Sequence, residues 1–311
     1  MTSCLLLLCA LGLAAAGPVA RALNRTTWLE RNPVLGLWVW QCLVTTALLS
    51  CLTALVLGTA AVFRTVRDHL FGSAPPGVAA YQPSSAPGWT TGLTLLMAAG
   101  AAWTVVVLIG QLRAVRRTRG AARARLRERA PELPAGLRAG RGPLLVLEEE
   151  YPDAWWMPGS PSQLVVTTGA LRRLTDRQLD AVLTHERGHA RARHDWLLHV
   201  SAALAGGFPK VPLFTHFCEQ THRLVELAAD DTAARHCGHV TTALALMELN
   251  QHRGVLSCAS GRRLLDDRVN RLLTPPPTIR PRQRTRIAIA AALGPLLPLL
   301  ITFAPGIDAL D

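Results

Sequence analysis

Charged residues are scarce in this sequence, and long stretches have none. They make up 17% of the 311 residues, whereas soluble domains are about a quarter charged. Four stretches contain no Asp, Glu, Lys or Arg: residues 1–20, 32–63, 70–112 and 287–307. This pattern excludes both a single soluble globule and a disordered chain. It predicts a membrane protein with one water-facing part that is large enough to have its own core.

Lysine and paired cysteines are scarce as well. Lys210 is the only lysine, so the net charge of +12 comes almost entirely from arginine, which we attribute to genome composition. The seven cysteines form no CxxC pair and have no regular spacing. This argues against a disulfide framework and predicts a reducing compartment for the water-facing part.

Several segments are long and apolar enough for a transmembrane helix, which needs about 20 such residues. They are residues 3–20, 34–62, 90–112 and 287–305. The first could be a secretory signal with a cleavage site in the alanine run at 14–16. However, a signal peptide has positive charge before its apolar run, and here the arginines follow it. That order predicts a retained helix with its N-terminus outside.

Arginines are grouped at alternate ends of these segments. Three follow the first segment, eight lie within 113–129, and four directly precede the last segment. The positive-inside rule places all three groups on the cytoplasmic face and the 64–89 loop outside. We therefore expect a multi-pass protein of the cell membrane. Its expected layout is three spans in 1–112, a basic juxtamembrane linker at 113–130, a cytoplasmic domain at 131–285, and a fourth span with a short tail at 286–311. The linker is expected to lie against membrane lipids, and no direct nucleic-acid binding is expected.

The water-facing part begins with segments typical of strands. Residues 143–149 and 163–168 are rich in Val and Leu and are predicted to be short strands. Pro158-Gly159 and Pro161 predict a turn between them. Trp155-Trp156, also between them, is compatible with an interfacial anchor or with a core position.

A helix is predicted over about 176–194, because a capping box occupies 175–178 and apolar residues follow with helical spacing. This helix has an HExxH motif. His185 and His189 are four residues apart, so they share a helix face and can bind one metal ion, with Glu186 beside them. A zinc ion lowers the pKa of a bound water toward about 7, and a nearby carboxylate can accept the proton. Glu186 is therefore the candidate general base.

A third metal ligand is available on a second predicted helix, roughly 219–235. Glu226 would complete a His-His-Glu set for one zinc ion per chain and leave the fourth position open for water, as in catalytic zinc sites. Asp230, one turn later, can accept a hydrogen bond from a ligand histidine and fix its tautomer. His222, four residues before Glu226, is a weaker candidate for such a partner. His194 is expected at a helix end, where a histidine suits the helix dipole.

Residues 155–273 resemble the membrane-embedded gluzincin metallopeptidases, which include the HtpX and CAAX-prenyl-protease type and the BlaR/MecR sensor-transducer type. The resemblance rests on LVVTTGALRRLTDRQLDAVLTHERGHA at 164–190, ELAAD at 226–230 and DRVNRL at 267–272. The order of the spans is more similar to the BlaR/MecR type. The resemblance implies a multi-span α-helical membrane protein with an α+β metallopeptidase domain inserted between spans three and four.

The resemblance also implies roles for individual residues. His185, His189 and Glu226 match the family's zinc ligands. Glu186 matches its general base, and Asp230 matches the carboxylate that partners a ligand histidine. Arg268 lies where related enzymes keep an arginine near the oxyanion, so it is the candidate electrophile. Only residues 308–311 follow the last span. We therefore expect no penicillin-binding sensor domain, and β-lactam sensing is not implied.

These observations predict a membrane-bound zinc endopeptidase that transduces a signal. The resemblance implies a cytoplasmic protein substrate such as a helix-turn-helix repressor, and possible self-cleavage. The substrate is expected to pair as an added strand with an edge strand at 163–168. One alternative is HtpX-like quality control or processing of membrane proteins. Another is a non-catalytic membrane transducer with a structural zinc site.

Overall fold

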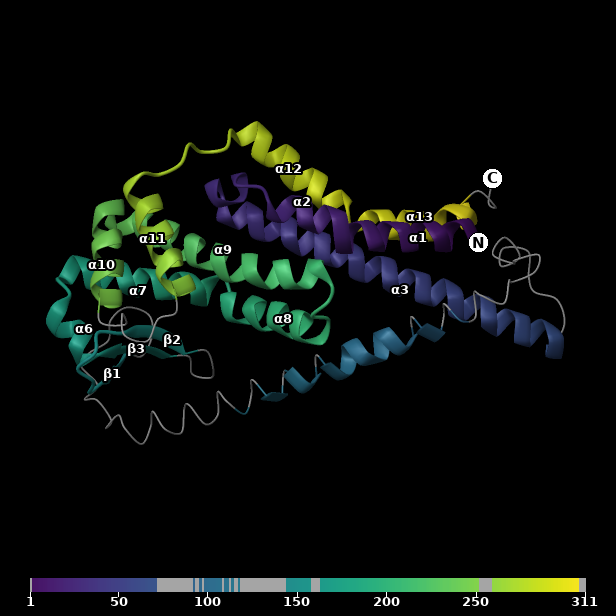
Figure 1. The fold of residues 1–311 in the computed structure, drawn as a ribbon, viewed down its shortest axis with the longest axis horizontal. Helices are drawn as coiled ribbons and strands as arrows, with labels where there is room; N and C mark the ends of the chain where they lie inside the picture. Colours follow the sequence, from purple (N-terminus) through teal and green to yellow (C-terminus); the bar gives the residue numbers. More distant parts are fainter. Residues whose placement is uncertain are drawn as a thin grey trace.

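The protein is elongated, with long apolar helices at one end and a small sheet at the other (Figure 1). This computed structural model describes residues 2–71, parts of 92–117, and residues 144–157, 163–251 and 259–307. The predicted turn at 158–161 and nearly all of the predicted basic linker lie outside the described residues, as does most of the predicted 64–89 loop.

The first apolar segment forms one continuous helical rod with a wide turn in its middle. It consists of α1 (Thr2–Ala14), the π-helical turn η1 (Ala15–Val19) and α2 (Ala20–Asn24). Pro18 lies inside the π-helical turn. Because proline has no N–H to donate within a helix, it accounts for the local change in winding.

The second apolar segment is a single long helix. After the short helix η2 (Trp28–Arg31), α3 runs over Pro33–Phe71. Its start is capped, since the Leu35 N–H donates to Asn32 Oδ1 at 3.2 Å. Ser3–Asn24 and Pro33–Thr59 are both long and apolar enough to cross a membrane. Two of the predicted spans are therefore confirmed as candidate membrane helices.

The other two predicted spans differ from simple rods. The third lies partly outside the described residues, and its described piece, Ala98–Gln111, is a shorter apolar helix. The fourth is a pair of helices, α12 (Pro281–Leu293) and α13 (Leu296–Ile307), which are bent by 42° and qualify as a span only together. Gly294-Pro295 stands at the bend, where proline cannot continue the backbone hydrogen bonds.

A three-stranded sheet forms the far end of the molecule. Its strands are β1 (Leu144–Leu147), β2 (Ala154–Met157) and β3 (Gln163–Thr167), in the order β1-β3-β2. β3 pairs parallel with β1 and antiparallel with β2. Both predicted strands are confirmed. The expectation of an edge strand at 163–168 is wrong, because β3 has a partner on each side.

Helices cover the sheet and lead back toward the apolar rods. They are α6 (Thr168–Arg173), α7 (Asp176–Arg191), α8 (His194–Gly207), α9 (Pro212–Cys237), α10 (His239–Gln251) and α11 (Ala259–Leu273). The capping box is confirmed, because the Thr175 N–H donates to Gln178 Oε1 at 2.9 Å and the Thr175 side chain accepts from the Gln178 N–H. α7 ends before the predicted residue 194, since Arg193 adopts a left-handed φ of 51°.

Two apolar cores hold these layers together. One lies under the sheet, where β2, β3 and α6 meet α7 and α10. The other unites the N-terminal rods with α8 and α9: Trp40 and Leu37 of α3 are buried in the same cluster as Phe217 and Leu224 of α9. A Cβ on Gly36 would lie 3.0 Å from Leu224 Cδ1, so the glycine lets α3 approach α9 closely. The helices that follow the HExxH motif are thus packed against the candidate spans.

Candidate metal centre

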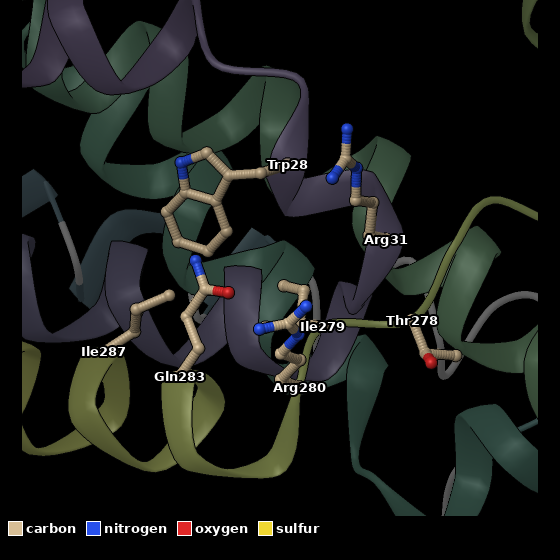
Figure 2. Close-up of a pocket in the computed structure, with 7 residues that line it drawn as sticks. All are labelled: Trp28, Arg31, Thr278, Ile279, Arg280, Gln283 and Ile287. Atoms are coloured by element: carbon tan, nitrogen blue, oxygen red, sulfur yellow. The ribbon is translucent and has the colours of Figure 1, made fainter.

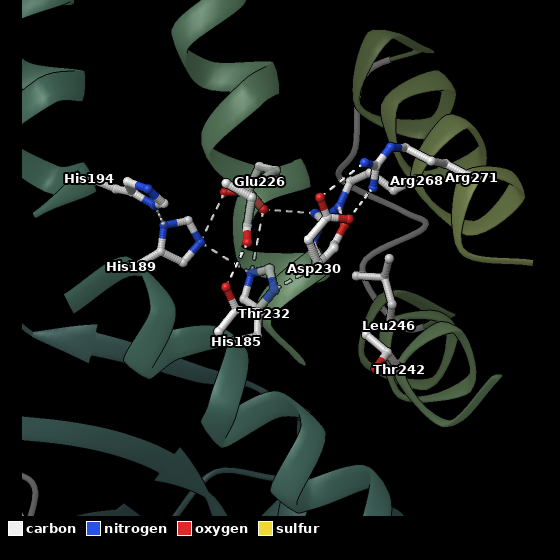
Figure 3. Close-up of polar contacts among 12 residues, drawn as sticks. His185, His189, His194, Glu226, Asp230, Thr232, Thr242, Leu246, Arg268 and Arg271 are labelled. Atoms are coloured by element: carbon white, nitrogen blue, oxygen red, sulfur yellow. Dashed lines mark hydrogen bonds and ion pairs between the residues drawn. The ribbon is translucent and has the colours of Figure 1, made fainter. Parts of the chain in front are cut away.

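Three predicted metal ligands come together where α7 crosses α9 (Figure 3). The Nε2 atoms of His185 and His189 are 3.2 Å apart. Glu226 Oε2 lies 3.7 Å from His185 Nε2, and Oε1 lies 3.5 Å from His189 Nε2. All the donor atoms are within 4.8 Å of one another, so one ion could bind all three.

Small residues allow the two helices to approach this closely. A Cβ on Gly188, which lies within the HExxH motif, would be 3.6 Å from Ala229 Cα on α9. Ala229 itself is fully buried. Because the distance between packed helices depends on the side chains at their contact, this pair permits Glu226 to reach the two rings.

The outward nitrogen of each histidine also has a partner. His185 Nδ1 lies 3.0 Å from Asp230 Oδ1, and His189 Nδ1 lies 3.0 Å from His194 Nδ1. Metal-binding histidines typically use their second nitrogen in this way, which fixes the tautomer and the ring orientation. Both Nε2 atoms therefore point inward with rings held from behind, and the donor set fits a zinc ion.

Burial and neighbouring charges shift the pKa values of the two ligand histidines in opposite directions. Burial lowers the pKa of His189 to about 4, so its ring is neutral. Burial also acts to lower the pKa of His185, but the hydrogen bond and the charge of Asp230 raise it above its usual value. Burial alone would raise the pKa of Asp230, but hydrogen bonds from Arg268 and His185 hold it well below its usual range. Neutral imidazole is the form that coordinates a metal. His189 is already in that form, whereas Asp230 favours a proton on His185 that metal binding would displace.

Arg268 of α11 is bound to both carboxylates of α9. Its Nε and NH2 groups donate to Asp230, both at 2.8 Å, and NH1 lies 2.8 Å from Glu226 Oε2. Burial alone would lower the pKa of Arg268, but Asp230 raises it above the usual value. The described partners of Arg268 are thus the carboxylates of Asp230 and Glu226, and Arg268 holds the two in place like a clamp. The oxyanion role of Arg268 stays a prediction.

Glu186 faces a cavity of about 110 Å³ that is also lined by His185, Glu226 and Arg268. Its Oε2 accepts a hydrogen bond of 2.9 Å from the Trp156 N–H of β2. Burial raises the pKa of this carboxyl group. One carboxylate oxygen is therefore held by the strand.

The family profile of peptidase family M48 matches residues 122–285. The match covers just over half of the chain. The chain belongs to peptidase family M48. The HExxH helix, the Glu226 helix and Arg268 all lie within the matched range, so the cluster belongs to the metallopeptidase part. Among curated proteins, the comparison finds no significant match.

Two histidines of this M48 peptidase differ from the expectations. His222 is exposed, and it is not among the residues that line the cavity, so the geometry gives no support to its predicted partner role. His194 is the first residue of α8, with 5% of its surface exposed, and it contacts His189. The sequence contained a five-residue spacing from His189 to His194. The contact between the two rings depends on the left-handed conformation of Arg193, which ends α7 and which no spacing rule predicts.

Strand β2 was also absent from the sequence prediction. Trp155 and Trp156 both lie in this strand, paired with β3. Trp156 is partly buried against the core under the sheet, which supports the core position for this residue. β2 is only four residues long (Ala154–Met157), which is too short for a periodic pattern to distinguish a strand.

Proposed function

We propose that this M48 peptidase is a membrane-bound zinc endopeptidase. The observation that carries the proposal is the convergence of His185, His189 and Glu226, with Glu186 on the wall of the same cavity. A structural zinc site has four protein ligands and no need of a base. The presence of Glu186 beside a three-residue donor set therefore supports hydrolysis over the non-catalytic alternative.

The roles of the side chains follow from their contacts. His185 and His189 would hold the ion through Nε2, and Glu226 through Oε1, while its Oε2 stays with Arg268. A zinc ion bound there would supply Lewis acidity for a peptide carbonyl and for a water molecule. Glu186 would accept the proton from that water with the oxygen that the Trp156 N–H does not hold, and later return it to the leaving amine.

The edge of β2 is the proposed binding place for the substrate backbone. In an antiparallel pair, successive residues direct their backbone groups alternately to either side of the strand. Because the Trp156 N–H is directed at Glu186, the backbone groups of Trp156 and Ala154 are on the side of β2 away from β3. A substrate added as a strand there would pass directly over the general base.

Two substrate classes are proposed, one from the resemblance and one from the position of the site. The BlaR/MecR-like reading proposes a cytoplasmic helix-turn-helix repressor as substrate, with self-cleavage as a possible activating step, and the N-terminus outside the cell. The shared core of α3, α8 and α9 favours a second candidate. It would bring the metal centre close to the membrane surface, which suits processing of membrane proteins.

The Glu186→Gln variant tests the hydrolytic proposal. We expect it to bind zinc like the wild type and to lose cleavage, because the amide cannot accept the proton. Glu219→Gln, an exposed position on α9, is the matched control and should keep full activity. Unchanged proteolysis by Glu186→Gln would refute the proposed role of Glu186 as general base.

The same pair of variants identifies the substrate. Quantitative proteomics of cytoplasmic and membrane fractions should reveal fragments that depend on Glu186. A fragment of a DNA-binding repressor would support the sensor-transducer reading, and fragments of many membrane proteins would support processing. Zinc binding without any Glu186-dependent fragment, together with no cleavage by the purified protein, would support the structural-zinc alternative.

A further inference from the structure

Residues 25–32 connect the first two candidate spans, and we call them the connector. A cavity of about 350 Å³ lies between the connector and α12 (Figure 2). Trp28 and Arg31 contribute from the connector, and Arg280, Gln283 and Ile287 contribute from α12 and its start. Small-molecule sites have volumes of about 300–1,000 Å³, so a compact polar group fits. We propose that this cavity binds the phosphate headgroup of an anionic phospholipid.

The cavity stands at the end of several membrane helices at once. The connector joins the candidate spans Ser3–Asn24 and Pro33–Thr59, and α12 begins the bent pair that forms the third candidate. α12 is fastened to α3, because Trp38 Nε1 donates to the Ala288 carbonyl at 3.2 Å. The ends of these helices must lie where hydrocarbon meets water, which is the depth of lipid phosphates.

The lining changes from charged to apolar in the direction that a lipid would require. Arg280 comes before α12, and Ile287 is the first residue of the charge-free stretch 287–307. The Trp28 ring is half-buried, and tryptophan is enriched at membrane interfaces. A phosphate would lie at the level of the arginines, and the first acyl carbons would lie against Ile287.

The described residues around the cavity do not neutralise its positive charge. Of the described residues that line it, none is acidic. The nearest acid along the connector, Glu30, is engaged on another side: its carboxylate lies 3.1 Å from Arg223 NH1 of α9. Arg282, Arg284 and Arg286 follow on α12 and add positive potential. Guanidinium groups bind phosphate oxygens with charge-assisted hydrogen bonds, so an anion is the fitting ligand.

The connector also contacts α11, the helix that carries Arg268. Arg271 of α11 donates to the Glu30 carbonyl at 3.0 Å, and Arg268, which binds Glu226 and Asp230, lies one turn earlier on the same helix. A lipid that orders the connector would thus act on helices that hold the site. The binding itself does not depend on the proposed peptidase activity, so its test can fail or succeed separately.

The test measures ligand binding to the full-length protein in neutral detergent. The probes are short-chain phosphatidylglycerol, short-chain phosphatidylcholine and inorganic phosphate, followed by native mass spectrometry and thermal shift. We expect phosphatidylglycerol to bind more tightly than either of the others, because it combines a net negative charge with acyl chains. Equal binding of phosphatidylcholine, or equal binding of inorganic phosphate, would overturn the assignment to an anionic lipid.

Variants locate the site. Arg31→Gln with Arg280→Gln should weaken phosphatidylglycerol binding about fivefold for each arginine removed, since a basic residue near anionic lipid contributes on that scale. Arg172→Gln with Arg177→Gln removes the same charge from exposed positions on α6 and α7, and should bind like the wild type. Equal losses in both variants would show a nonspecific charge effect and reject the cavity.

A charge-preserving pair protects the test against misfolding. Arg31→Lys with Arg280→Lys should bind phosphatidylglycerol more tightly than the glutamine pair, because both positive charges remain. Zinc affinity is measured without lipid and reports that the protein is folded. It should be unchanged in every variant, because the described contacts of the metal ligands and of Arg268 do not include the changed arginines. Lysine and glutamine pairs of equal affinity would contradict the proposal.

Discussion

Replacing Arg268 by glutamine separates two roles that this residue could have. In the structure its guanidinium group binds Asp230 through Nε and NH2 and Glu226 through NH1, all at 2.8 Å. The side chains of Arg268 and Asp230 are only 11% and 2% exposed. Removing one partner of such a buried ion pair costs about 3–5 kcal/mol, so we expect a lower unfolding temperature.

The effect on the metal follows from the same contacts. Without Arg268, Asp230 loses the groups that fix its carboxylate, and it holds His185 less firmly. Loss of such an outer partner typically lowers metal affinity about 10–100-fold. We therefore expect Arg268→Gln to bind zinc 10–100-fold more weakly in competition with a chromophoric chelator, and to recover most of its peptidase activity when zinc is saturating.

Arg271→Gln is the matched control for this prediction. Arg271 lies on the same helix, is 12% exposed at its side chain, and pairs with Asp231 rather than with the metal side. It should lower the unfolding temperature without changing zinc affinity. If Arg268→Gln instead kept its zinc affinity and lost activity about 100–1,000-fold at saturating zinc, the clamp reasoning would be refuted and the oxyanion role supported.

Three further predictions concern the metal centre and the sheet. His194→Ala removes the partner of His189 Nδ1 and should weaken zinc binding about 10–100-fold in the same competition assay; an unchanged affinity would show that the contact is incidental. Chelation with EDTA should lower the unfolding temperature of the wild type but hardly that of Glu226→Ala, because zinc at about 100 times its Kd adds about 2.7 kcal/mol to a protein that binds it. Gly169→Ala should destabilise the junction of the sheet with α6 by about 1–3 kcal/mol, because a Cβ on this α6 residue would overlap the Glu150 carbonyl oxygen. Gly17→Ala, which meets nothing within 4 Å, is its control in thermal unfolding, and similar shifts in both would contradict the steric argument.

The sequence by itself determined the features that depend on neighbours along the chain. The apolar runs predicted the candidate spans, and the capping box predicted the start of α7. The spacing of His185 and His189 predicted their shared face, since residues four apart are adjacent on any α-helix. Glu226 and Asp230 followed from the same rule on a second helix. These predictions needed only helical geometry and composition.

The tertiary structure decided the features that depend on contacts between distant parts of the chain. β3 lies in the centre of the sheet, and β2 donates a hydrogen bond from the Trp156 N–H to Glu186. Neither could be read from the sequence, because strand pairing depends on which segments meet. The core shared by α3 with α9 depends likewise on packing. The bonding of Arg268 to Glu226 and Asp230 joins helices that no local pattern relates. Local geometry determines which residues share one face of a helix or strand. Which of these faces pack against each other is decided only when the apolar faces of all the elements are buried together.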